Sequence, residues 1–505
     1  MKKKVIKKKM LGPVIAIMLL TLIIVILSAV FSMLQIVAEQ TAISKNALET
    51  SIVTVNNILT KDGIKYILSN MLVNLQLFEP LVLLIISLIT VSIGEASGLF
   101  KAVLSPLAKL NPKFLTFLVL LVGISSSFIG EYSYIFLLPM VAVLYQIIGR
   151  KPLLGILTMF IGISIGYGTG LVYNNEDIIL GTLTQTAASL DVDKNYVYAY
   201  NSNSYFMFVS TFILSLVGVF IIHGVLDKKV PKSTYEETEE IVVSKKALYY
   251  SNMALVFMLL IILYMIVPGL PGSGVLLGDG ESYIEKLIGN NSPFYQGFTF
   301  IVLGISLVCG YIYGYISKNI KNSNEFSVGL SKNFEGLGYV FVLLFFVSQM
   351  LGILEWTNLG KVIACGFVSL VGSFTFTGIA LLIVFFIAVV LMSILMPDTQ
   401  SKWNIVSPLI VPLMMRTNIA PSFTQLVFRI ADGVGKSITP FFAYYMIMLA
   451  FLEKYNTKEN NKITVFGTLR LILPTILLFA GLWLLILVGW YIIGLPTGPG
   501  IYPTL

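Results

Sequence analysis

Histidine and cysteine are both scarce in this chain. Its 505 residues include one histidine, His223, and two cysteines, Cys309 and Cys365, which lie in or beside apolar runs without a motif spacing. This pattern argues against a metal site and against a disulfide framework. The sequence also lacks a Walker-type phosphate loop, so an ATP-driven pump would need a separate ATPase. No histidine cluster or metal motif supports a membrane-embedded enzyme, which we keep as the alternative from another functional class.

Charge is scarce as well. Only 11% of the residues are charged and 57% are hydrophobic, whereas soluble proteins carry about 25% charged residues. The chain therefore reads as a multi-pass protein of the cytoplasmic membrane, surrounded by the lipid bilayer. Its net charge of +8 sits at the ends of apolar segments, where it sets membrane orientation, so we expect no nucleic-acid partner. The basic start, MKKKVIKKKM, precedes an apolar run too long for a signal peptide, which predicts a retained helix and a cytoplasmic N-terminus.

Apolar and polar stretches divide the chain into five predicted regions. They are 1–67, a first transmembrane helix and an extracytoplasmic segment; 68–227, repeat one with a hairpin at 114–148; 228–248, a cytoplasmic linker; 249–335, two linking transmembrane helices; and 336–505, repeat two with a hairpin at 396–430. Within them we expect a short amphipathic helix after Asp62, a span at 72–94, and a polar stretch from 174 to 204. The segment 338–374 either spans once or returns.

The most informative stretch is Met396–Pro440, which is broken and polar inside a very apolar chain. A polar turn at 397–403 precedes two apolar runs of roughly ten residues, which are too short to span a bilayer singly and predict a re-entrant hairpin. Irregular backbone at membrane depth needs surrounding protein or a water-filled cavity. The second run ends with Arg429, Asp432 and Lys436, and intramembrane ionisable residues indicate a functional site. This combination is typical of secondary transporters.

The two halves resemble each other at one place. The turn Gly130–Tyr134 lies shortly before Pro139, and the turn Thr399–Trp403 lies shortly before Pro408. A glycine-rich break follows each of them, at 166–170 and at 433–435. The basic loops give the two hairpins opposite orientations. We therefore expect inverted repeats, with the site where hairpin tips meet broken helices.

Several motifs in this order resemble those of the AbgT family, the p-aminobenzoyl-glutamate transporters. They are Gly94–Leu99, Gly149–Leu153, Asn203–Met207, Trp356–Gly360, Ser401–Trp403, Arg429–Asp432 and Ile438–Pro440. The resemblance implies an all-α membrane protein with about nine transmembrane helices and two re-entrant hairpins, assembled as a homodimer. It also implies cation-driven transport of p-aminobenzoyl-glutamate or efflux of sulfonamide antimetabolites. The family's site residues fall on Asp177, Trp403, Pro421, Arg429, Asp432 and Pro440.

The chain departs from the family's small polar runs at three places: 397–400, 168–170 and 432–436. The missing Ser and Asn side chains are those that would bind sodium. Lys436 lies one helical turn after Asp432. Its ammonium either replaces the bound cation beside Asp432 or reaches out to water. We expect no cofactor except a coupling ion, Na⁺ or H⁺, with Asp177 or Asp432 as the proton carrier.

Each candidate residue has two interpretations. Arg429 either pairs with Asp432, three residues on, or holds a substrate carboxylate as a bidentate fork. Trp403 either packs or forms an aromatic wall. Glu131 and Asp177 belong either to the site or to surface loops, and Gln400 and Ser126 bind either the ligand or the unwound backbone. Pro421 and Pro440 mark helix breaks. The expected substrates are organic anions: p-aminobenzoyl-glutamate-like conjugates or sulfonamide-like antimetabolites, and alternatively other carboxylates or peptide-like anions.

Overall fold

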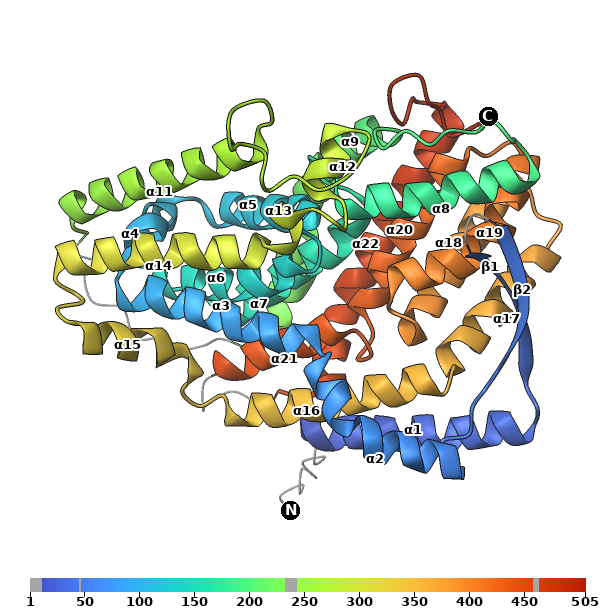
Figure 1. The fold of residues 1–505 in the computed structure, drawn as a ribbon, viewed down its shortest axis with the longest axis horizontal. Helices are drawn as coiled ribbons and strands as arrows, with labels where there is room; N and C mark the ends of the chain where they lie inside the picture. Colours follow the sequence, from blue (N-terminus) through green and yellow to red (C-terminus); the bar gives the residue numbers. More distant parts are fainter. Residues whose placement is uncertain (1–10, 45–46, 232–242, 457–462) are drawn as a thin grey trace, which may run out of the picture.

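A computed structural model describes residues 11–44, 47–231, 243–456 and 463–505 (Figure 1). Three predictions fall outside these residues in whole or in part. They concern the basic N-terminal run (1–10), the middle of the central linker (232–242), and residues 457–462 in one of the basic loops from which the hairpin orientations were predicted.

The first half of the chain is helical apart from one β-hairpin. Its elements are α1 (Pro13–Met33), β1 (Val37–Ser44), β2 (Ala47–Thr54), α2 (Lys61–Gln76), α3 (Glu79–Ala96), α4 (Leu99–Leu104), η1 (Ser105–Lys109), α5 (Pro112–Ser125), η2 (Ser126–Ile129), α6 (Tyr132–Ile147), α7 (Pro152–Ile165), η3 (Gly166–Gly168), α8 (Asn175–Asp191), α9 (Ser204–Ile221), a π-turn η4 (Ile222–Leu226) and α10 (Asp227–Lys229).

In its described elements, the second half consists of helices joined by loops, with one isolated β-bridge between Gly498 and Ile501. It contains α11 (Lys245–Ile266), α12 (Tyr283–Ile288), α13 (Pro293–Gln296), α14 (Phe298–Ser317), α15 (Ser323–Ser331), η5 (Lys332–Phe334), α16 (Gly338–Trp356), α17 (Leu359–Ser373), α18 (Gly378–Leu395), α19 (Thr399–Arg416), α20 (Pro421–Ser437), α21 (Ala443–Lys454) and α22 (Val465–Ile493). In Figure 1, α11, α14 and α15 lie at one end of the long axis, and α17, α18, α19 and the β-hairpin lie at the other.

Among the described residues, nine helices are long and apolar enough to cross a membrane. Large apolar side chains such as Leu22, Phe257 and Phe300 are exposed on them. Soluble monomers rarely expose so much apolar surface, whereas lipid tails accept it. The expectation of a polytopic helical membrane protein with about nine spans is confirmed.

Helix α20 lies at the centre of the fold. All 17 of its residues are buried, although it carries an arginine, an aspartate and a lysine. It packs against α7, α8, α18, α19, α22 and η3. Because every face of the helix meets protein, its charged side chains must find partners on neighbouring helices.

The two short apolar runs predicted after Met396 are wrong in length. Helix α19 has 18 residues and α20 has 17. The reason is that the polar residues 399–404 are helical rather than a turn, because the Asp398 carboxylate caps α19 by accepting the Ser401 amide at 2.6 Å. In the first half, α5 and α6 are separated by η2, and both pack against α7. The re-entrant course of both hairpins, the inverted repeats and the domain boundaries stay predictions.

Three other segments differ from the sequence prediction. Strands β1 and β2 pair antiparallel from Val37↔Thr54 to Ser44↔Ala47, in a segment for which we predicted no strand. The helix predicted after Asp62 is present, but α2 continues to Gln76, so the next span, α3, begins at Glu79 rather than at 72. The stretch from 174 to 204, predicted only as polar, contains α8, which begins after a capping box formed by Asn174 and Asp177.

The segment 338–374, which we left open, consists of two helices. They are α16 and α17, and they meet at Asn358, whose φ of 56° is left-handed. An asparagine tolerates this conformation better than most residues, because its short side chain bonds locally.

Candidate functional site

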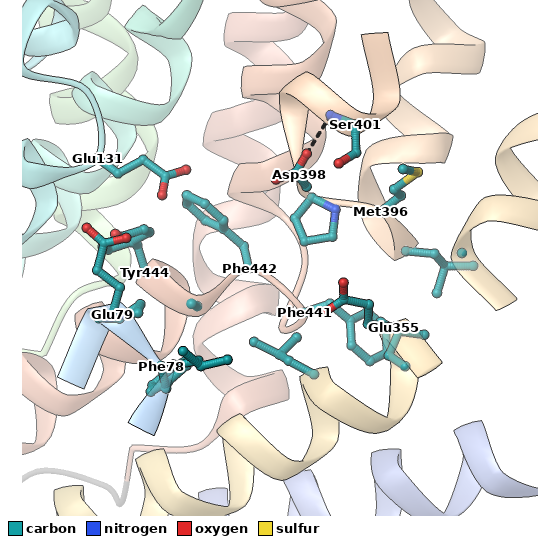
Figure 2. A pocket seen from close by; sticks show the side chains of 18 of the residues that line it. Phe78, Glu79, Glu131, Glu355, Met396, Asp398, Ser401, Phe441, Phe442 and Tyr444 are labelled. Atoms are coloured by element: carbon teal, nitrogen blue, oxygen red, sulfur yellow. Dashed lines mark hydrogen bonds between the residues drawn. The ribbon is translucent and has the colours of Figure 1, made fainter. Parts of the chain in front are cut away.

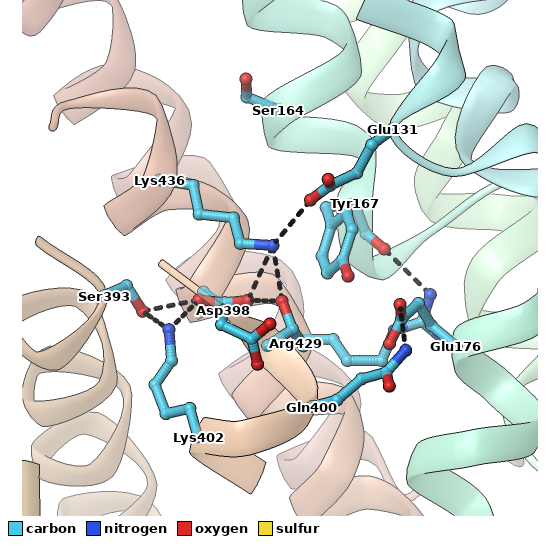
Figure 3. Close-up of polar contacts among 12 residues, drawn as sticks. Glu131, Ser164, Tyr167, Glu176, Ser393, Asp398, Gln400, Lys402, Arg429 and Lys436 are labelled. Carbon is cyan, nitrogen blue, oxygen red and sulfur yellow. Dashed lines mark hydrogen bonds and ion pairs between the residues drawn. The ribbon is translucent and has the colours of Figure 1, made fainter. Parts of the chain in front are cut away.

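The buried arginine of α20 is paired across the fold. Arg429 Nη1 binds the Asp177 carboxylate of α8, and Nη2 donates to the Tyr167 carbonyl of η3 at 2.9 Å (Figure 3). Both charged side chains are 1% exposed. The pairing of Arg429 with Asp432 is therefore wrong, because the two side chains leave α20 toward different neighbours. In this arrangement the guanidinium is held by Asp177 and the Tyr167 carbonyl, and only its Nε lacks a partner among the described residues.

Asp432 is the centre of a second group, which we name the Asp432 cluster: Ser393, Thr399, Lys402, Asp432 and Lys436. Its carboxylate accepts hydrogen bonds from Ser393 Oγ at 2.7 Å and Thr399 Oγ1 at 2.5 Å, and it forms an ion pair with the Lys402 ammonium. Lys402 also donates to Ser393 Oγ at 2.7 Å. A buried carboxylate is stable only with such partners.

Lys436 joins this cluster instead of reaching water. Its side chain is 2% exposed, and its Nζ lies 3.6 Å from Asp432 Oδ2 and 3.7 Å from Glu131 Oε1. The ammonium donates to Thr399 Oγ1 at 2.6 Å and lies 4.3 Å from the centre of the Tyr167 ring. The interpretation in which Lys436 reaches out to water is wrong, because Lys436 occupies the space beside Asp432.

Trp403 is packed rather than exposed to a cavity. Its side chain is fully buried, and its ring centre lies 4.4 Å from that of Phe428. Its indole N–H donates to Thr184 Oγ1 at 3.0 Å and contacts the Leu180 carbonyl. It therefore joins α19 to α8 and α20, which corresponds to the packing interpretation.

The other predicted residues are distributed over several places. Gln400 Nε2 donates to Glu176 Oε1 at 3.2 Å, and Glu131 is 44% exposed at the end of η2. Ser126 is buried and donates to the Gly123 carbonyl at 2.6 Å, so it satisfies backbone in the last turn of α5. Pro421 is the first residue of α20, and Pro440 lies in the turn between α20 and α21. Both prolines shape the ends of the central helix.

Two cavities adjoin this region. We name the first the Glu176 cavity: it has a volume of about 250 Å³ and is lined by Glu79, Gly130, Glu131, Tyr132, Tyr167, Asn175, Glu176, Tyr295, Asp398, Thr399, Gln400, Lys436 and Tyr444. The second, the Phe441 cavity, measures about 380 Å³ (Figure 2). The two share Glu79, Glu131, Asp398 and Tyr444, so they are neighbours with these residues between them. Thr399 and Lys436 belong both to the Glu176 cavity and to the Asp432 cluster.

Sequence reasoning missed Lys402 and Glu176 as site residues. The signal for Lys402 was present, because a lysine in a predicted intramembrane segment needs the same explanation as Arg429. Glu176 was hidden in the stretch that was taken for a polar loop. Conversely, Asp177 and Arg429 line neither cavity, although both were predicted as ligand-binding residues.

Comparison with known proteins decides the family. Residues 4–505 match the family model described as "AbgT putative transporter family". The chain belongs to the AbgT family. This AbgT-family protein is 26% identical over 464 residues to the p-aminobenzoyl-glutamate transport protein of Escherichia coli (strain K12), covering 92% of this chain and 89% of that protein.

Two solved structures resemble this AbgT-family chain over their whole length. The Neisseria gonorrhoeae MtrF structure, whose title describes a class of antimetabolite efflux pumps, has a TM-score of 0.50 and 26% identity and covers 98% of each chain. The Alcanivorax borkumensis YdaH transporter structure has a TM-score of 0.50 and 24% identity, and the match covers 97% of this chain and 100% of that chain. This likeness supports the fold alone. The protein is thus a membrane transporter and not an enzyme.

Proposed function

We propose that this AbgT-family protein is a secondary active transporter of p-aminobenzoyl-glutamate-like conjugates or sulfonamide-like antimetabolites, in the cytoplasmic membrane. One observation carries the proposal: a buried charge cluster, the Asp432 cluster, and the Glu176 cavity share Thr399 and Lys436. A change of charge in the cluster is therefore felt on the wall of the cavity. Such contact between an ion site and a substrate site is what gradient-driven transport requires.

We further propose that the Lys436 ammonium replaces a coupling sodium ion. A sodium site needs several oxygen ligands. Here the carboxylate oxygens of Asp432 already form ion pairs with Lys402 and Lys436 and accept hydrogen bonds from Ser393 and Thr399. An ammonium carries the same charge as the ion. Transport would then use protons. Glu131 is a partly exposed carboxylate that lies 3.7 Å from Lys436, and Lys436 links it to Asp432. Asp177, bound to Arg429, is the remoter candidate.

The assembly follows from the family resemblance. We propose a homodimer with a cytoplasmic N-terminus, in which each protomer contains its own cavity and Asp432 cluster. The charge cluster and the cavities described above are formed within one chain, which supports one transport pathway for each protomer.

Counterflow in proteoliposomes tests the transport function without assuming a driving ion. Vesicles loaded with unlabelled p-aminobenzoyl-glutamate should accumulate the labelled compound when they contain the protein. Asp432→Asn should abolish accumulation, because it leaves two buried ammonium groups without their carboxylate. The control Arg416→Gln, at an exposed position of α19, should match the wild type. Accumulation no higher than in protein-free vesicles, for this substrate and for sulfonamides, would contradict the proposal.

A further inference from the structure

In the Glu176 cavity, hydrogen-bond acceptors outnumber donors. Negative charge on its walls also exceeds positive charge. Four carboxylates line it, from Glu79, Glu131, Glu176 and Asp398, against one ammonium, that of Lys436. That ammonium is already bound to Asp432 and Thr399. Charge on the walls of a cavity acts on a ligand inside it, most strongly where water is excluded, and Glu176 is less exposed than Glu79 and Asp398. The cavity therefore repels carboxylates and attracts groups that donate N–H bonds.

Two buried acceptor atoms on residues that line this cavity have no partner among the residues that the structure describes. One is Glu176 Oε2, since Gln400 binds only the other oxygen of that carboxylate. The other is Asn175 Oδ1, on a side chain that is 4% exposed. The Asn175 amide is orientated by its own donor, because Nδ2 bonds to Asn290 Oδ1 at 2.7 Å. Buried polar atoms are normally satisfied, and unsatisfied ones at a cavity indicate a missing ligand group.

Aromatic side chains form the remaining walls. Tyr132, Tyr167, Tyr295 and Tyr444 all line the cavity, and the rings of Tyr132 and Tyr295 lie 5.9 Å apart. Aromatic faces suit both an aryl ring and a cation. Glu176 and Gln400 meet beside Tyr167 (Figure 3), so acceptors and ring faces occur together.

We propose that Glu176 and Asn175 bind the amino group of the substrate. The group is an N–H donor attached to an aromatic ring, either a neutral arylamine or an alkylammonium, with Oε2 of Glu176 and Oδ1 of Asn175 as its acceptors. This inference rests on the proposed transport function and deepens it. It places the amine end of the substrate in the Glu176 cavity and keeps the carboxylate end out of it, because carboxylates already crowd the walls.

Three matched ligands test the inference by calorimetry on the purified full-length protein in lipid nanodiscs. They are 4-aminobenzoyl-glutamate, its N-acetyl derivative, which loses one N–H and gains bulk, and 4-(aminomethyl)benzoyl-glutamate, which is an ammonium at neutral pH. The two amines should bind at least about 10-fold more tightly than the acetylated compound, a difference of about 1.4 kcal/mol. Tighter binding of the ammonium than of the arylamine would identify charge as the larger contribution, and equal binding would identify hydrogen bonding. Both results support the site.

Glu176→Gln then locates the effect. This change keeps an oxygen for Gln400 but puts an N–H₂ group at the position of Oε2, where it faces the ligand amine as a second donor. Amine binding should weaken at least about 10-fold, while binding of the acetylated compound should stay within about twofold. Glu335→Gln, at an exposed position that lines neither cavity, removes the same charge and should change nothing.

The outcomes separate the two proposals. Equal or tighter binding of the acetylated compound by the wild type refutes the amine site, while transport itself stands. Loss of all three ligands in Glu176→Gln to the same extent also refutes it, since the residue would then only support the fold. Benzylamine, which lacks the glutamate part, provides an independent readout. If it raises the melting temperature of the wild type but not of Glu176→Gln, the amine site holds even where no conjugate is transported.

Discussion

Replacing Asp177 with asparagine removes the charge that neutralises Arg429 at the centre of the fold. Both side chains are 1% exposed, so water cannot take over as the partner. Breaking one side of a buried ion pair costs about 3–5 kcal/mol. Asp177 Oδ2 also accepts the Asn174 amide at 2.8 Å in the capping box of α8, and disturbing that cap adds up to about 1 kcal/mol. The two changes are not symmetric, because a guanidinium stays charged whereas a carboxylate can take up a proton.

We therefore expect the free energy of unfolding to fall more in Asp177→Asn than in Arg429→Gln. In the double variant it should fall by less than the sum of the two single values. The assay is reversible denaturation in mixed micelles with graded detergent, read by tryptophan fluorescence. A second Arg–Asp pair offers a matched control. Arg416 and Asp191 lie 2.7 Å apart and join α19 to α8, whereas Arg429 and Asp177 join α20 to α8, and the side chains of Arg416 and Asp191 are 62% and 38% exposed. Asp191→Asn and Arg416→Gln should cost at most about 1 kcal/mol each.

The double variant decides the argument. If the pair acts as a unit, its destabilisation should be smaller than the sum of the two single values by about 2 kcal/mol or more, because no charge remains buried without a partner. Strictly additive values, or single variants as mild as the exposed control, would refute the account of a buried structural pair.

Three further predictions follow from the site. Lys436→Asn should produce sodium-stimulated transport, because it vacates the space beside Asp432 and supplies an amide oxygen; a variant as indifferent to sodium as the wild type would count against this. Trp403→Phe should lower the free energy of unfolding by about 1–3 kcal/mol, because Thr184 loses the indole donor, while substrate preference in counterflow stays unchanged; altered preference at unchanged stability would contradict the packing role. Light scattering of the protein in detergent and in nanodiscs should give twice the 55.7 kDa chain mass, and a monomeric mass at all concentrations would exclude the proposed dimer.

Composition and apolar run lengths were sufficient to predict the membrane class. The helical spans follow from local hydrophobicity, which does not depend on distant contacts. The β-hairpin was predictable in principle, since Thr41, Ile43, Ile52 and Val53 are typical strand residues. It was missed because its two strands have only 8 residues each and are much shorter than the predicted helices. The hairpin is also held by a distant contact, from the Ile43 amide to Asn404 Oδ1 at 3.1 Å.

The partners of the charged residues could not be predicted. Arg429 and Asp432 share a helix face by spacing, which made a local pair the simplest interpretation. The actual partner of Arg429 is 252 positions away on α8. A fully buried helix contacts a different neighbour on each side, and sequence spacing says nothing about which one. The lysine beside Asp432 was predictable for the opposite reason, since Lys436 follows it by one turn of the same helix.

Uptake driven by separately imposed sodium and pH gradients tests the coupling mechanism most directly. Proteoliposomes carrying the wild type receive an inward sodium gradient at equal pH, or a pH gradient in sodium-free buffer, with labelled p-aminobenzoyl-glutamate as substrate. The account predicts that the pH gradient alone drives accumulation and that the sodium gradient has no effect, because the Lys436 ammonium already occupies the cation position. Strict dependence on sodium, with no response to the pH gradient, would contradict it.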